Sequence, residues 1–310
     1  MSSDVAALYE RLIERDLDAI PDAVRTFRES HSSDDLFLAV ARFAILAYAP
    51  SQHAKHAVLA TLSAFQLRDA YGDRWDELLA ECVRYAAESR QPWSEPPILD
   101  PPPPGERGDV DALREAVAAR DRLAAERWLS ARLDDPIDDL LLVAADDFED
   151  FGHKVIVTSA AWKLAGILGE KGRYAALRIA VWEMTSLGGA PPPPAAIRRD
   201  RAAEGGGAPL SERLIENAVA EKGSLEAMHL VFLYEAARDT KIFPRVCDYL
   251  ASQQLHAGQS LPAAGPPPIY RLARDYAQCL KAYAIGDDRL KAAALYNLEH
   301  APSFADWSFA

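Results

Sequence analysis

The chain has 310 residues, of which 49% are hydrophobic and 26% are charged, and this composition excludes disorder over the whole length. The 47 acidic and 34 basic residues give a formal net charge of -13. Such a chain repels phosphate backbones, so we expect no nucleic acid partner. The length suits one large domain or two modest ones.

Targeting signals are the next feature to consider. The first residues, 1–16, lack a basic segment followed by an apolar one, and no stretch approaches the ~20 apolar residues needed to span a bilayer. Three cysteines, Cys82, Cys247 and Cys279, are far apart and odd in number, which is typical of reduced thiols. These features predict a cytoplasmic protein with no membrane partner.

Almost every segment has helical periodicity and is rich in Ala, Leu, Arg and Glu, without the alternation of β-branched and polar residues that marks a strand. The predicted fold class is therefore all-α. Stretches rich in proline and glycine separate the helical blocks, at 92–104, 188–209 and 258–268.

Self-similarity between blocks predicts an internal repeat. Residues 4–16 align with 109–121 without a gap and match at seven of thirteen positions, and 34–36 fall opposite 138–140. Repeated helical units bury their apolar faces on one another, so we expect one domain over 1–310, compact or solenoid-like. The predicted units are three pseudo-repeats and a C-terminal helical cap, at about 4–91, 109–188, 210–257 and 268–310. Two domains split near 101–105 are the alternative.

A shorter similarity begins with a histidine in each of three blocks, at 56–64, 153–161 and 229–237. The His, the Val two residues later and the Ala eight residues later agree in all three. Positions four and seven after each His share its helical face and are mostly small or apolar, namely Ala60, Ser63, Val157, Ala160, Leu233 and Ala236. We expect this face to be buried together with its histidine.

Another potential ligand stands three residues before each histidine, on the same face if the turn is regular. The pairs are His53 with His56, Asp150 with His153, and Glu226 with His229. Carboxylate-x-x-His on facing helices builds the di-iron and di-manganese sites of helix bundles, and mixed imidazole and carboxylate ligands suit Fe, Mn or Zn. The pattern predicts a site for one or two non-haem iron ions, with Mn or Zn as alternatives.

Each pair also has a structural interpretation, as a core histidine hydrogen-bonded to its own polar neighbour. His300, Lys154 and Glu149 are further candidates whose participation the sequence leaves open, and Lys55 adjoins a candidate ligand. The two interpretations differ in geometry. A metal site requires His56, His153 and His229 to converge on one buried cavity, whereas a solenoid spreads them ~10 Å apart along its axis.

The helices that begin His56-Ala-Val-Leu, Gly152-His153-Lys-Val-Ile and Met228-His229-Leu-Val, separated by proline loops, resemble those of the questin oxidase-like proteins. The resemblance covers roughly 53–237. It implies a non-haem iron held by histidines and Baeyer-Villiger-type oxidative ring cleavage of aromatic polyketides. This chain has Gln52-His53-Ala54 where that family has Asn-His-Gly.

The first functional hypothesis is a non-haem iron oxygenase or oxidase that uses O2 on a small, largely apolar metabolite. Its electrons would come from NAD(P)H or a redox partner. The second is a non-catalytic helical-repeat scaffold whose acidic surface binds another protein. The third is a zinc-dependent hydrolase, for which Glu149 or Glu235 would be the general base.

Overall fold

The computed structural model describes residues 3–46, 52–89, 101–105, 108–186, 209–220, 225–253, 281 and 284–291. Within these ranges every regular element is a helix, with fourteen α-helices, one 3-10 helix and no strand. The all-α prediction is confirmed. Most of the predicted C-terminal cap, including His300, lies outside the described residues.

The helices of the first half are α1 (Ser3–Glu14), α2 (Ile20–Arg28), α3 (Ser33–Leu46), α4 (Gln52–Gln66), α5 (Arg68–Tyr71), the 3-10 helix (Gly72–Arg74) and α6 (Trp75–Ser89). The helices of the second half are α7 (Val110–Ala118), α8 (Arg122–Ser130), α9 (Ile137–Ala144), α10 (Glu149–Leu168), α11 (Glu170–Ser186), α12 (Leu210–Ala220), α13 (Leu225–Ala237) and α14 (Phe243–Ser252).

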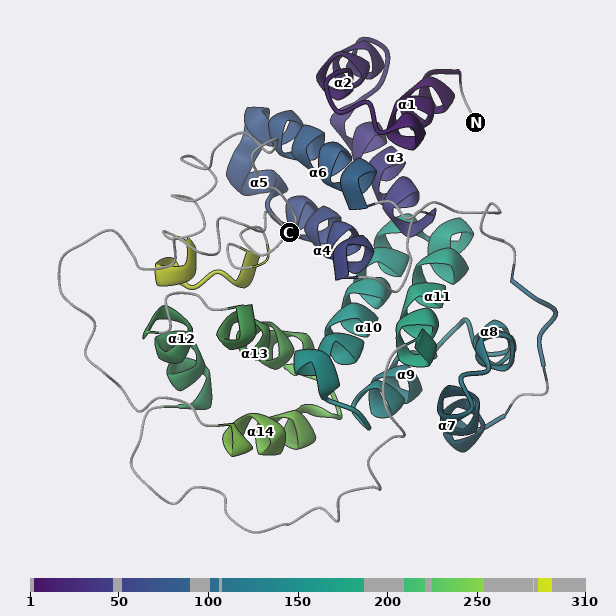
Figure 1. Cartoon of the computed structure of the whole chain (residues 1–310), viewed down its shortest axis with the longest axis vertical. Helices are drawn as coiled ribbons and strands as arrows, with labels where there is room; N and C mark the ends of the chain where they lie inside the picture. The colour runs from purple at the N-terminus through teal and green to yellow at the C-terminus, as the bar shows by residue number, and fades with distance from the viewer. Residues whose placement is uncertain are drawn as a thin grey trace.

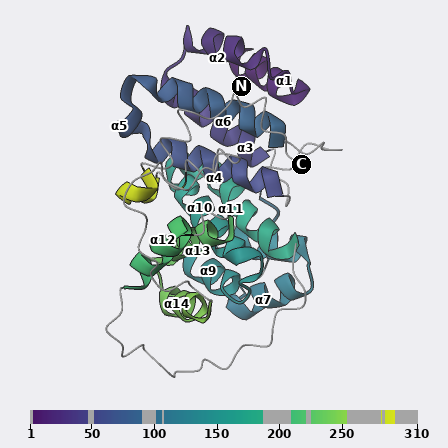
Figure 2. The ribbon, with the colours of Figure 1, turned by 60° about the vertical axis from the view of Figure 1, so that its left-hand side comes forward.

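The same helix pairings occur in the first two blocks. Helix α1 packs on α2, α3 on α4, and α4 on α6, while α7 packs on α8, α9 on α10, and α10 on α11. Figure 2 shows the first block stacked on the second, with α1 and α2 at one end of the molecule and α7 and α14 at the other.

Helix α10 lies in the middle of the molecule and contacts α4, α9, α11 and α13 (Figure 1). Its side chains are apolar or small almost all round, and Val155, Val157, Ala161 and Leu164 are each at most 1% exposed. A helix that is apolar on every face is stable only when it is covered on every face. The helices therefore pack around α10 as a single compact domain, and the solenoid-like arrangement is not adopted.

Local signals set the helix ends. Ser32 and Asp35 form a reciprocal capping box at the start of α3, with the Asp35 amide donating to Ser32 Oγ and the Ser32 amide donating to Asp35 Oδ2. The Asp109 side chain accepts two backbone amides at the start of α7. Helix α10 stops at Gly169, whose φ of 67° is unfavourable for residues with a side chain.

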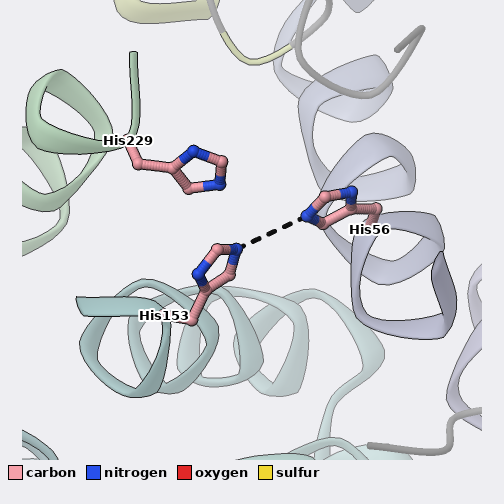
Figure 3. Close-up of side chains that lie close together, drawn as sticks. All are labelled: His56, His153 and His229. Carbon is pink, nitrogen blue, oxygen red and sulfur yellow. Dashed lines mark hydrogen bonds between the residues drawn. The ribbon is translucent and has the colours of Figure 1, made fainter. Parts of the chain in front are cut away.

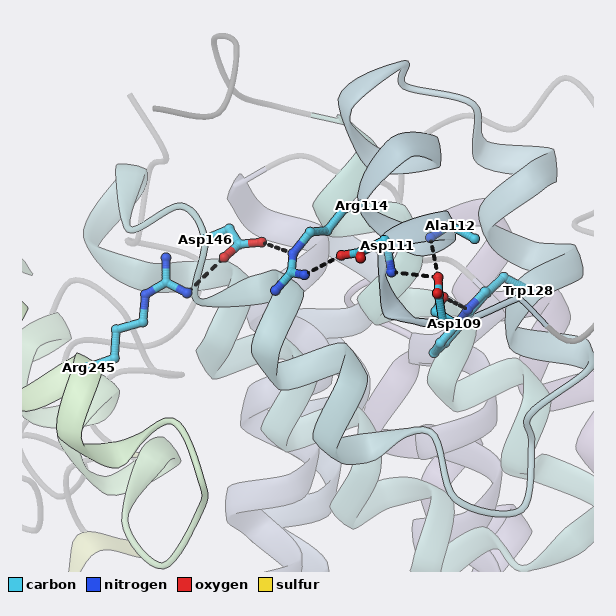
Figure 4. A network of polar contacts seen from close by, with 7 residues as sticks. All are labelled: Asp109, Asp111, Ala112, Arg114, Trp128, Asp146 and Arg245. Carbon is cyan, nitrogen blue, oxygen red and sulfur yellow. Dashed lines mark hydrogen bonds and ion pairs between the residues drawn. The ribbon is translucent and has the colours of Figure 1, made fainter. Parts of the chain in front are cut away.

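An ion-pair network ties α14 to the second block (Figure 4). Asp146, just beyond α9, accepts from Arg114 Nε of α7 at 2.8 Å and from Arg245 Nη1 of α14 at 2.7 Å. The hydrogen bond to Asp146 is the main reason why the pKa of Arg114 is raised above its usual value. Asp146 thus joins helices that are distant in sequence.

Two further predictions concern thiols and membranes. Cys82 and Cys247 are free thiols, and burial raises the pKa of both, while Cys279 lies outside the described residues. In the part of the chain that the structure describes, no helix has both the length and the apolar character needed to cross a bilayer.

Candidate metal site

Three histidines from three different helices meet in the interior, at the contact of α4, α10 and α13 (Figure 3). His56, His153 and His229 are 7%, 4% and 1% exposed. Each ring offers a nitrogen that lies within 4.8 Å of the nitrogens offered by the other two. The predicted convergence of these three side chains is confirmed.

The spacing of the nitrogens fits a shared metal ion. Ligand nitrogens about 2.1 Å from one ion are separated by about 3.0–3.4 Å in octahedral or tetrahedral geometry. His56 Nε2 lies 3.4 Å from His153 Nε2, a distance that also permits a direct hydrogen bond between neutral rings. The other nitrogen separations are at most 4.8 Å. Three histidine ligands leave further coordination positions for water or substrate.

Helix α10 brings His153 to the cluster through an irregular first turn. Phe151 and Gly152 have φ values of 55° and 77°, so two consecutive residues are left-handed within the helix. A Cβ on Gly152 would lie 2.8 Å from both Cδ atoms of Leu233 on α13, which only glycine avoids. Such strain in a non-glycine residue persists only where the surroundings impose it, and it is common at functional sites.

The irregular turn affects the prediction for Asp150. The sequence argument placed Asp150 on the face of His153 on condition that the turn was regular, and the backbone of Phe151 and Gly152 does not meet that condition. The side chains of Asp150, His53 and Glu226 all lie outside the described residues. Among described residues, the group that can hold a metal contains the three histidines and no carboxylate.

Aromatic rings form part of the wall of the cluster. The centroid of the Phe151 ring lies 5.9 Å from that of His229, and Phe232 stands edge-on to the same histidine at 5.9 Å. The His153 and His229 rings are themselves 4.3 Å apart. Water-poor surroundings of this kind strengthen the bonds between a metal and neutral imidazole ligands, because few solvent molecules compete for the ion.

A buried ion pair lies next to His56. The Lys55 ammonium donates to Glu183 Oε1 of α11 at 3.3 Å, and the two side chains are only 2% and 3% exposed. The sequence marked Lys55 only as a neighbour of candidate ligands, and its carboxylate partner 128 positions away has no sequence signal. The pair anchors α4 at the residue that precedes its histidine.

The remaining candidates do not enter the cluster. Lys154 donates to Asp147 Oδ2 at 2.5 Å, and this contact occupies its ammonium. Glu149 is exposed. Neither belongs to the group of side chains that can share an ion, so the three histidines remain the described candidates.

A pocket of about 350 Å³ is lined mainly by residues of the same three helices, although the three histidines themselves are not among its lining residues. Its lining residues follow the histidines at fixed intervals. Three positions later they are Leu59, Ile156 and Phe232. Seven positions later they are Ser63, Ala160 and Ala236. Ten positions later they are Gln66, Lys163 and Asp239. The small side chains at the middle level leave the space that the pocket occupies.

The sequence predicts that the face of the histidines is buried, but it does not predict this pocket. The sequence signal for the pocket is the small residues Ser63, Ala160 and Ala236, each of which follows one of the three histidines by seven positions. Glu235, one candidate for a general base, also lines the pocket, and burial raises the pKa of its carboxyl. The three helices that carry the histidines therefore also line a binding space with a carboxylate in its wall.

Comparison with known proteins gives no further assignment. The chain matches no protein family model, no curated protein and no solved structure. The functional conclusion therefore rests on the buried three-histidine cluster, which can hold a metal ion.

Proposed function

We propose that the protein is a metal-dependent oxidoreductase in which one non-haem iron ion, bound by His56, His153 and His229, acts with O2 on a small, largely apolar metabolite. The single observation that supports it is the convergence of three buried imidazoles from separate helices. Three neutral imidazoles from separate helices can bind one metal ion together, and the ion would then join α4, α10 and α13 at the cluster.

Iron is the proposed ion because imidazole ligands suit Fe as well as Cu, Ni and Zn, and non-haem iron oxygenases that hold iron with two histidines and one carboxylate keep open coordination positions for O2. The bound iron would supply O2 activation. The residues of the chain orient the substrate and exclude water: Phe232 contributes its ring to both the cluster and the pocket. The resemblance to the questin oxidase-like proteins supports the same chemistry, and oxidation of an aromatic ring is part of this proposal.

The proposal is tested by metal analysis after anaerobic reconstitution with ferrous iron. We expect about one equivalent of iron, and an EPR signal that appears when nitric oxide is added as a surrogate for O2. Less than about 0.3 equivalents of any transition metal would contradict the proposal and favour the scaffold.

His153→Ala is expected to abolish iron binding with nearly unchanged helicity, since the ring is not part of the helix backbone. The control is His31→Gln, because His31 packs on Phe27 far from the cluster, with 4.3 Å between ring centroids. Retention of iron by His153→Ala, or its loss in both variants, would contradict the proposed ligand set.

A zinc-dependent hydrolase is a second candidate, and one observation favours it. Three histidines without a carboxylate are the ligands of some catalytic zinc sites, and Glu235, which lines the pocket between the same helices, would be the general base. Zinc in the protein as isolated, with ester hydrolysis and no O2 uptake, would establish this alternative.

A further inference from the structure

The pocket between α4, α10 and α13 has an exposed rim and a buried floor. The rim consists of the exposed side chains ten positions after the histidines, namely Gln66, Lys163 and Asp239. The floor consists of apolar side chains three positions after them, each at most 5% exposed, namely Leu59, Ile156 and Phe232. Seven residues of helix separate the two levels by about 10 Å. A ligand that enters from solvent therefore meets polar groups first and apolar side chains below them.

Lys163 is a basic group of the rim without an acidic partner among the described residues. The Arg238 guanidinium is paired, because its Nη2 lies 3.1 Å from Glu235 Oε2. Lys281 lies deeper, with its ammonium 4.3 Å from the centroid of the Phe232 ring. In the part of the chain that the structure describes, no carboxylate forms an ion pair with Lys163. Its amine is therefore accessible to a ligand at the entrance of the pocket.

The surroundings of Lys163 favour the neutral amine. The neighbouring helices remove part of the water around its ammonium, and this desolvation lowers its pKa. The charge of Glu235 opposes this effect, and the positive charge of Arg238 adds to it. More of Lys163 than of an ordinary surface lysine is therefore unprotonated near neutral pH. Only the unprotonated amine is a nucleophile.

Glu235 provides a proton donor close to this amine. Lys163 on α10 and Glu235 on α13 both line the pocket, and the charge of each group shifts the pKa of the other. Burial raises the pKa of the Glu235 carboxyl, so it holds its proton to a higher pH than an ordinary glutamate does. A carboxyl group in this condition is suited to general acid catalysis.

We propose that this pocket binds a small aldehyde or ketone with an apolar body, and that Lys163 Nζ forms an imine with its carbonyl carbon. The apolar body lies against the floor residues Leu59, Ile156 and Phe232, which leaves the carbonyl group near the rim. A volume of about 350 Å³ is at the small end of the range for ligand pockets, about 300–1,000 Å³.

The reaction balances without a metal ion or an oxidant. The lone pair of Nζ forms a C–N bond, the carbonyl π bond breaks, and the oxygen takes up the proton that the nitrogen loses. The hydroxyl group of this carbinolamine then leaves as water, with a proton from the Glu235 carboxyl. The products are a protonated imine and the Glu235 carboxylate. The imine site is therefore independent of the proposed iron chemistry.

Reductive labelling of the protein as isolated tests this site. The probes are naphthalene-2-carbaldehyde, which has an apolar body, and formaldehyde, which has none. Sodium cyanoborohydride converts each imine to a stable amine, and peptide mass spectrometry measures the labelling rate of each lysine. Lys171, at an exposed position of α11 outside the pocket, is the control within the same molecule.

We expect the naphthalene aldehyde to label Lys163 at least about 10-fold faster than Lys171 at neutral pH, because a neutral amine and a bound apolar body both favour the reaction. Equal rates at the two lysines would overturn the proposal. Formaldehyde responds to the amine alone, so its preference for Lys163 should be at least about 3-fold smaller. Equal preferences of the two aldehydes would contradict binding of the apolar body in the pocket.

A variant that fills the pocket locates the site. Ala236→Leu adds volume at a half-buried lining position and should remove the preference of the naphthalene aldehyde for Lys163. It should leave the labelling by formaldehyde unchanged. Ala7→Leu, at an exposed position of α1, is the matched control and should change neither rate. An unchanged preference in folded Ala236→Leu, checked by circular dichroism, would overturn the proposal.

The comparison of lysines and aldehydes in the unaltered protein needs no variant, so it decides the question even if Ala236→Leu fails to fold. Iron binding without selective labelling of Lys163 would reject the imine site alone. Selective labelling in a protein that binds no iron would support the imine site and reject the iron proposal alone.

Discussion

Helices α4 and α10 present equivalent histidines to one cluster, but their histidines are held in different ways. In α10 the turn before His153 is left-handed at Phe151 and Gly152 and lies directly against Leu233. In α4 the residue before His56 is Lys55, which is fixed by the buried carboxylate of Glu183. One position depends on backbone geometry and close packing, the other on a buried ion pair.

The comparison shows that related blocks need not conserve the means by which they position a side chain. The helix pairings are the same in both blocks, so the fold defines where each helix lies. The exact position of each histidine ring depends on residues that differ between the blocks. Variants at these residues should therefore separate the stability of the fold from the affinity for metal.

The largest effect is expected at the α4 position. Lys55→Met leaves Glu183 buried without its cation, which should lower the free energy of unfolding by about 3–5 kcal/mol in chemical denaturation. The double variant Lys55→Met/Glu183→Leu should recover most of that loss, since it removes both charges. A single variant as stable as the double would show that the pair does not anchor α4.

Lys241→Met is the control for this prediction. Lys241 pairs with Asp138 on the surface, where solvent screens the interaction, so the unfolding midpoint should not change.

The next effect is expected at the α10 position. Gly152→Ala combines an alanine in a left-handed conformation with a Cβ that would lie 2.8 Å from Leu233. It should lower the free energy of unfolding by about 2–4 kcal/mol in chemical denaturation, and it should weaken metal binding. Gly169→Ala, directly after the last residue of the same helix, is a matched control, because its φ is 67° but nothing lies within 4 Å of the added Cβ.

Gly169→Ala should therefore lower the free energy of unfolding only through backbone strain, by about 1–2 kcal/mol. It should leave the affinity for metal unchanged in competition titrations. Equal effects of the two alanines on metal affinity would show that the contact with Leu233 does not position His153.

The smallest effect is expected at the network that joins α7 and α14. Asp146→Ala removes the partner of Arg114 and Arg245, which should lower stability by about 1–3 kcal/mol in thermal or denaturant unfolding. Metal affinity should be unchanged, because His153 depends on its own turn rather than on the outer helices. A parallel loss of metal affinity would contradict this separation.

The fold class and the meeting of the three histidines are predictable from the sequence because both depend on periodic patterns. The apolar and small residues at helical spacing identified the buried faces, and the shared His, Val and Ala positions related the blocks. Such patterns record which face of a helix is covered, and this information is sufficient to bring three rings together.

The remaining features depend on contacts between distant segments. Glycine at 152 permits a positive φ, but the positive φ of Phe151 has no local sequence signal. The pairing of Lys55 with Glu183 likewise requires the tertiary arrangement. The pocket could have been suspected from the small residues at +7, although its charged lining comes partly from the separate segment at 281–285.

The most direct test of the central claim is anomalous diffraction at the iron edge from crystals of the anaerobically reconstituted protein. We predict a single peak in the cluster, with one ring nitrogen each from His56, His153 and His229 within about 2.0–2.3 Å. A cluster with no peak, in which His56 and His153 keep only their direct contact, would contradict the claim that these histidines form a metal site.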